Sequence, residues 1–138
     1  MTAPRLLVLA DDLIWATRLE GQGRTLGADV QRFTTTEPLI AALAAHPATP
    51  TDLVAIDATA RAYNAEAAVR AVAATGARVL ALVQHEDPEG RASLIAAGAA
   101  RAMPYRALFE RGHGILAGLL DLPVPPVTSP ATPTEEGA

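Results

Sequence analysis

The stretch "TDLVAID" (51–57) decides the fold, because it is an unbroken apolar run that ends on a carboxylate. Two other runs have the same character, "RLLVLA" (5–10) and "RVLALVQ" (78–84). Short continuous apolar runs bounded by polar residues are typical of strands that are covered on both faces of a sheet. We therefore predict that these three segments are the central strands of a parallel sheet.

The remaining segments predict edge strands and helices. "DVQRFTT" (29–35) alternates apolar and polar residues, and "RAMPY" (101–105) is short, so both suit the edges of the sheet. Helical segments are expected between and after the strands, over 12–27, 38–46, 65–75, 88–97 and 107–121. Strands that alternate with helices predict an α/β fold, a doubly wound parallel sheet of the (βα)5 type with strand order 2-1-3-4-5.

The first predicted helix has one clear apolar face and two weak points. Trp15, Leu19 and Leu26 lie on the same side of a helix. Gly21 and Gly23 each weaken a helix by about 1 kcal/mol relative to alanine. The apolar face nevertheless favours a helix that packs on the sheet.

The length of 138 residues indicates one domain, which we place at 1–121. The last segment, 122–138, reads "LPVPPVTSPATPTEEGA" and is rich in proline and hydroxyl residues. Such a composition predicts a disordered tail. The absence of cysteine excludes a disulfide framework, a thiolate zinc site and a thiol nucleophile.

The charge balance argues against two classes of partner. The net charge is −4, so nothing indicates binding to nucleic acid or to an anionic membrane. No apolar run approaches the length of a membrane span, and the first residues do not resemble a signal peptide. We therefore expect a cytoplasmic protein. All eleven basic side chains are arginines, and the chain contains no lysine.

Carboxylates follow two of the predicted central strands. Asp11 and Asp12 follow the segment 5–10, and Asp57 is the last residue of the segment 51–57. The carboxyl ends of these strands meet at the crevice where a doubly wound sheet binds its ligands. Clustered carboxylates are commonly neutralised by Mg2+, so Asp11 and Asp57 are candidate metal ligands, with weak binding expected. Asp12 is a weaker candidate, because its position also suits a helix N-cap.

These motifs resemble the receiver domain of bacterial response regulators, a flavodoxin-like domain that histidine kinases phosphorylate. The resemblance covers residues 5 to 120 and rests on "RLLVLADD" (5–12), "TDLVAID" (51–57), "RVLALVQHED" (78–87) and "LIAAGAARAMPY" (94–105). It implies that Asp57 is the phosphoacceptor. It also implies that Ala10 stands where the family has its first metal-binding acid, with Asp11 as the second.

The departures from the family concern the groups that bind and read the phosphoryl. Val83 stands at the position of the family's Ser or Thr, and Tyr105 stands at the position of its lysine. No shift of alignment restores the lysine, because the chain has none. Losing such partners costs on the order of kilocalories per mole each. The resemblance therefore implies an atypical receiver, or pseudo-receiver, with a degenerate switch.

The expected function is a stand-alone, non-enzymatic signalling module that binds another protein or a second copy of itself. The resemblance places its surface on the last two helices and the strand between them, with Leu94, Arg101, Tyr105, Arg106, Leu108, Phe109 and Ile115 as candidates. One alternative is a working single-domain response regulator of a two-component phosphorelay, phosphorylated on Asp57. Another is a small-ligand binder of the same fold, such as a flavin module with Trp15 as a stacking residue.

Overall fold

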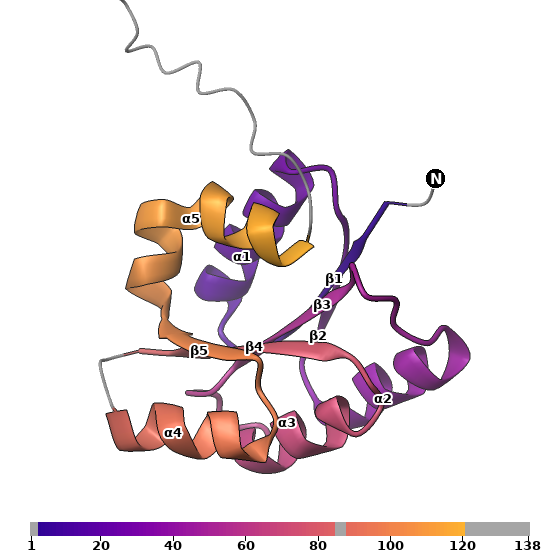
Figure 1. The fold of residues 1–138 in the computed structure, drawn as a ribbon, viewed down its shortest axis with the longest axis vertical. Helices are drawn as coiled ribbons and strands as arrows, with labels where there is room; N and C mark the ends of the chain where they lie inside the picture. Colours follow the sequence, from indigo (N-terminus) through magenta and orange to yellow (C-terminus); the bar gives the residue numbers. More distant parts are fainter. Residues whose placement is uncertain (1–2, 85–87, 121–138) are drawn as a thin grey trace, which may run out of the picture.

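The computed structural model describes residues 3–84 and 88–120, without the side chains of 111–115. It contains one parallel sheet with strand order β2-β1-β3-β4-β5, so the predicted doubly wound (βα)5 fold is confirmed (Figure 1). The strands are β1 (Arg5–Leu9), β2 (Asp29–Phe33), β3 (Leu53–Asp57), β4 (Arg78–Val83) and β5 (Arg101–Pro104). The helices are α1 (Leu13–Thr25), α2 (Thr36–Ala45), α3 (Ala65–Ala73), α4 (Pro88–Ala97) and α5 (Tyr105–Leu120).

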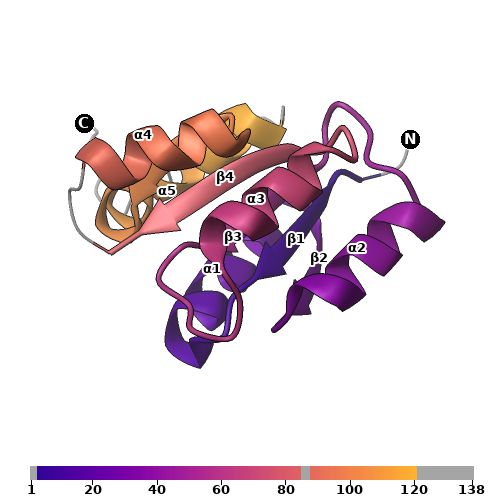
Figure 2. The same ribbon diagram turned by 90° about the horizontal axis from the view of Figure 1, so that it is seen from below.

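The helices form two layers, with α1 and α5 on one face of the sheet and α2, α3 and α4 on the other (Figures 1 and 2). Each layer has its own apolar core. Alternate residues of β3 point to opposite faces, so Leu53 and Ala55 pack with α1 and α5, whereas Val54 and Ile56 pack with the other layer. Continued alternation places Asp57 on the α1–α5 face.

The predicted strand positions are confirmed. Central strand β3 is buried throughout, and β1 and β4 are buried except at their first residues, whereas edge strand β2 is largely exposed. The last strand is shorter than predicted, because Pro104 ends β5 and Tyr105 already begins α5. In the part of the chain that the structure describes, no helix is both long and apolar enough to cross a membrane. The predicted tail, 122–138, lies outside the described residues.

An ion pair joins the amino ends of β1 and β3. The buried carboxylate of Asp52 accepts hydrogen bonds from the backbone N–H of Arg5 at 2.8 Å and from its guanidinium at 2.9 and 3.1 Å. The same guanidinium also donates to the carbonyl oxygens of His46 and Pro47. A buried ion pair with this many hydrogen bonds is costly to break, so it holds β1 beside β3. Asp11 and Asp57 lie at the opposite, carboxyl ends of these two strands.

The two glycines of α1 lie in different surroundings, which makes them a matched pair for mutation. A Cβ at Gly21 would meet no atom within 4 Å, whereas a Cβ at Gly23 would lie 2.7 Å from Leu6 Cδ2 and 2.9 Å from Val30 Cγ2. We expect Gly21→Ala to raise the free energy of unfolding by about 0.5–1 kcal/mol, through helix propensity. Gly23→Ala should lower it by about 1–3 kcal/mol, because the core becomes overpacked. Urea denaturation measures both, and an equal gain in both variants would contradict the packing of α1 on β1 and β2.

Candidate functional site

Asp57, the last residue of β3, is a buried carboxylate with one satisfied oxygen. Its side chain is 1% exposed, and Oδ1 accepts hydrogen bonds from the backbone N–H of Thr59 at 2.8 Å and from its hydroxyl at 2.6 Å. The buried Oδ2 has no hydrogen-bond partner among the described residues. Burial raises the pKa of Asp57, the bonds from Thr59 oppose this, and the nearby charges of Asp11 and Asp12 raise it further.

The other two predicted acids are occupied by backbone groups. Asp11 accepts hydrogen bonds from the backbone N–H groups of Arg61 at 3.0 Å and Ala62 at 3.1 Å. Asp12 is the N-cap of α1, as its alternative interpretation predicted, and it accepts from the N–H groups of Ile14 and Trp15. Within residues 3–84 and 88–120, no group of three acidic or histidine side chains is placed to hold a metal. Asp11 and Asp57, each with one oxygen bonded to N–H or hydroxyl donors, stay the candidate ligands for the weak Mg2+ binding that the sequence predicts.

Tyr63 joins the carboxyl ends of the two strands that carry these acids. Its hydroxyl lies 2.9 Å from the carbonyl oxygen of Leu9 and 2.7 Å from that of Asp57, and the phenol donates to these acceptors. Burial raises the pKa of Tyr63 above its ordinary value, and the charges of Asp57 and Asp11 add to this effect. The phenol therefore remains a proton donor. The sequence carried no signal for this role, because Tyr63 lies in an irregular connection.

Tyr105 is buried, whereas the sequence prediction placed it on an interaction surface. It is only 1% exposed and belongs to the same apolar core as Leu82 and Met103. Its ring stacks on Trp15, with the two ring centroids 4.5 Å apart. Burial raises the pKa of Tyr105, and the largest charge contribution comes from Asp57. The position that the resemblance assigns to a lysine thus holds a buried phenol that stays protonated.

The aromatic contact continues to the surface between α1 and α5. Phe109 lies 5.4 Å from Trp15 and 5.8 Å from Tyr105, measured between ring centroids. The guanidinium carbon of Arg18 lies 4.4 Å from the centre of the Phe109 ring, a cation–π distance. A hollow of about 340 Å³ opens beside these groups, lined by Trp15, Arg18, Arg106, Phe109 and Glu110. Trp15, which the flavin alternative needs as a stacking residue, stacks on protein side chains instead.

Val83, the other predicted switch position, packs away from Asp57. It is 8% exposed and lies in the core under α2, α3 and α4, on the opposite face of the sheet from the row of Asp57. The register explains this, because Asp57 pairs with Leu82 in β4, and Leu82 pairs with Met103 in β5. The residue at this strand end is therefore an ordinary core residue.

The predicted interaction surface is partly wrong. Leu94, Tyr105 and Leu108 are buried, because they supply the apolar faces with which α4 and α5 cover the sheet. Arg101 and Arg106 are exposed and Phe109 is partly buried, whereas the side chain of Ile115 lies outside the described residues.

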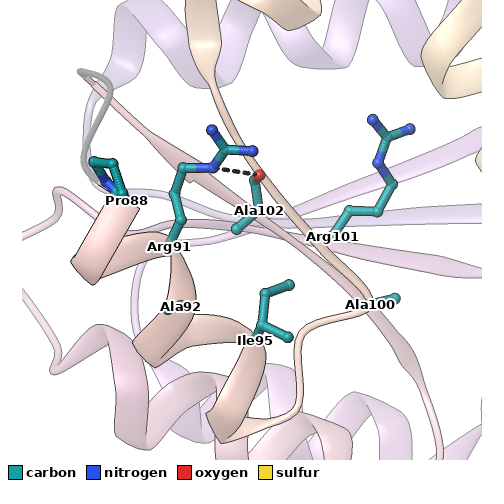
Figure 3. A pocket seen from close by; sticks show the side chains of 7 residues that line it. All are labelled: Pro88, Arg91, Ala92, Ile95, Ala100, Arg101 and Ala102. Atoms are coloured by element: carbon teal, nitrogen blue, oxygen red, sulfur yellow. Dashed lines mark hydrogen bonds between the residues drawn. The ribbon is translucent and has the colours of Figure 1, made fainter.

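A hollow of about 470 Å³ lies between α4 and β5, lined by Pro88, Arg91, Ala92, Ile95, Ala100, Arg101 and Ala102 (Figure 3). Of these residues, only Arg101 belongs to the predicted surface. Ile95 is 46% exposed there, and Arg91 Nε donates to the carbonyl oxygen of Ala102 at 3.0 Å. In sequence, Leu94 and Ile95 are adjacent apolar residues of one helix. Periodicity alone does not decide which of the two faces the core.

The hydroxyl of Thr59 gives a direct test of the carboxylate site. We expect Thr59→Val to lower the free energy of unfolding by about 1.5–3 kcal/mol at pH 7, where a charged acceptor loses its donor. The loss should be smaller at pH 3, because protonation of Asp57 leaves a neutral acceptor, and neutral hydrogen bonds contribute less. Denaturant titrations at the two pH values measure this difference. Thr59→Ser is the control, since it keeps the hydroxyl, and an equal loss at both pH values would contradict the assignment.

Comparison with known proteins identifies the fold. No sequence family and no curated protein matches the chain. Among solved structures, a two-component response regulator from Clostridium difficile superposes with a TM-score of 0.74 at 10% identity, covering 86% of this chain and 96% of its own. A response regulator receiver protein from Burkholderia phymatum gives 0.68 at 23% identity, covering 88% and 98%. The BeF3-activated DrrB receiver domain gives 0.67 at 20% identity, covering 87% and 99%. The chain therefore has the flavodoxin-like fold of response regulator receiver domains.

Proposed function

We propose that this chain is an atypical receiver module of two-component signalling, which acts by protein–protein binding and whose phosphorylation switch is degenerate. The observation that carries the proposal is Tyr105, a buried phenol at the position that resembles the family's lysine. The fold supports the general class, and the residues around Asp57 support the loss of the switch.

Phosphorylation of a carboxylate needs positive charge, and the surroundings of Asp57 supply little. Charge develops on three phosphoryl oxygens during transfer, and metal ions and cationic side chains normally neutralise it. Here the chain has no lysine, and the charges that act on Asp57 are the negative ones of Asp11 and Asp12. Asp57 is also almost completely shielded from solvent. The site therefore disfavours both the approach of a phosphoryl donor and the charge of the product.

The route by which a phosphoryl group would be read is also missing. Val83 has no hydroxyl to donate to a bound phosphoryl, and it packs in the core on the opposite face of the sheet. A ligand changes the conformation of a protein only if it interacts differently with the two states. Because Val83 has no polar side-chain atom, it cannot pass a change at Asp57 to α4 through a side-chain hydrogen bond.

The hollow between α4 and β5 is the surface that fits a protein partner best. Figure 3 shows Ile95 on α4 and Arg101 on β5, and both residues line the hollow. An exposed isoleucine beside exposed arginine suits a partner that offers an apolar side chain next to a carboxylate. A second copy of this acidic chain is one such partner.

A titration with Mg2+ and beryllofluoride, followed by amide NMR, tests whether the switch works. We expect no chemical-shift change along α4 and β5, because the groups that would carry it are absent. Asp57→Asn is the control, since it removes the acceptor carboxylate. Changes at Ile95 or Arg101 that disappear in this variant would show a working response regulator instead.

Substitution of Ile95 tests the binding surface. We expect Ile95→Asp to weaken self-association, or binding to a protein cross-linked from cell extract, by about tenfold or more, as for the loss of a central interface residue. Sedimentation and binding isotherms measure the effect. Ile14→Asp is a matched control, because Ile14 is 71% exposed on another helix. Equal weakening in both variants, or loss of binding in Asp57→Ala alone, would contradict the proposed surface.

A further inference from the structure

Two buried polar atoms near the carboxyl edge of the sheet lack hydrogen-bond partners among the described residues. They are Oδ2 of Asp57 and the hydroxyl oxygen of Tyr105, and both side chains are 1% exposed. A buried polar atom without a partner costs about 1–3 kcal/mol, and more if it is charged. Folded proteins leave few such atoms unsatisfied, so each of them needs an explanation.

The two atoms belong to neighbouring parts of one surface of the sheet. Asp57, Leu82 and Met103 form one row across β3, β4 and β5. Tyr105 follows Met103 by two residues and packs in the same core. The negative charge of Asp57 is also the strongest charge that acts on the phenol of Tyr105. Both unpartnered oxygens therefore belong to residues on the α1–α5 side of the sheet, near its carboxyl edge.

Their chemistry is complementary, and the other polar groups nearby are already committed. The hydroxyl of Thr59 donates to Oδ1 of Asp57, and the hydroxyl of Tyr63 lies against two backbone carbonyl oxygens. Tyr105 is thus a phenol with a proton to donate, on the same side of the sheet as a carboxylate oxygen that lacks a donor. We propose that the Tyr105 hydroxyl and Oδ2 of Asp57, which do not bond to each other directly, are hydrogen-bonded through one buried water that accepts from the phenol and donates to the carboxylate. Tyr105 is then a positioning residue for this carboxylate.

This water-mediated hydrogen bond links Asp57 to a row of contacting side chains that reaches the surface. The ring of Tyr105 stacks on Trp15, which in turn contacts Phe109 and Arg18 beside the hollow between α1 and α5. A change at Asp57 is therefore felt at the α1–α5 surface, away from the α4–β5 hollow. This inference goes beyond the proposed function, since it holds whether or not a partner occupies the α4–β5 hollow.

The single tryptophan of the chain provides the test, because the NMR signal of its indole N–H and its fluorescence report on Trp15 alone. Asp57→Ala is introduced into the full chain and into Tyr105→Phe, which keeps the ring and removes only the hydroxyl. We expect Asp57→Ala to shift the Trp15 signals in the full chain, and to produce a several-fold smaller shift in Tyr105→Phe. Tyr63→Phe is the control background, in which the full shift should persist.

Two results would overturn the proposal. One is an equal Trp15 shift on Asp57→Ala in the presence and absence of the Tyr105 hydroxyl. The other comes from a direct measurement on the unmodified chain and on Asp57→Asn, which guards against a variant that folds poorly. A hydrogen-bonded hydroxyl proton of Tyr105 exchanges slowly and gives its own NMR signal, which Asp57→Asn should move. If that signal is absent, or is the same in both proteins, the hydrogen bond does not exist.

Discussion

Helices cover both faces of the three central strands, and this burial controls where charge is found in the molecule. Within β1, β3 and β4, polar side chains are confined to the ends, because an unpaired charge under either helical layer costs several kcal/mol. At the amino end, Asp52 is matched by Arg5 with a full set of hydrogen bonds. At the carboxyl end, Asp57 has no cationic partner of this kind among the described contacts. The carboxylate that precedes β3 is thus paired with a cation, whereas the one that ends β3 has only neutral donors, on one of its oxygens.

The protein accommodates Asp57 with dipoles and phenols in place of a cation. Thr59 satisfies one carboxylate oxygen, Tyr63 satisfies the backbone carbonyl of the same residue, and Tyr105, at the start of α5, packs in the core on the same side of the sheet. A lysine at position 105 would need its ammonium hydrated or paired, whereas a tyrosine ring gains from burial and stacking. Position 105 therefore contributes a packed aromatic ring to the core between α1 and α5.

The two hollows of the molecule lie on opposite sides of the sheet. The α4–β5 hollow lies over the core that contains Val83, and the α1–α5 hollow lies over the core that contains Tyr105. The sheet stands between these cores, and side chains alternate across it. A side chain at the end of β3 therefore points toward only one of the two cores. In this molecule Asp57 points to the α1–α5 side, so that side is the one to which it is physically connected.

The order of apolar runs and polar ends in the sequence determined the fold, the central and edge strands, and the meeting of Asp11 and Asp57 at one edge. It also determined the N-cap at Asp12 and the absence of lysine, because these depend on local pattern or on composition alone. Tertiary structure decided which of Leu94 and Ile95 is exposed, that Tyr105 is buried, and that Asp11 accepts hydrogen bonds from the backbone N–H groups of the β3–α3 connection. The stacking of Trp15 on Tyr105 and Phe109 joins α1 to α5 from opposite ends of the chain. Periodicity shows that a helix has an apolar face, but the orientation of each side chain depends on the partners that the folded sheet brings to it.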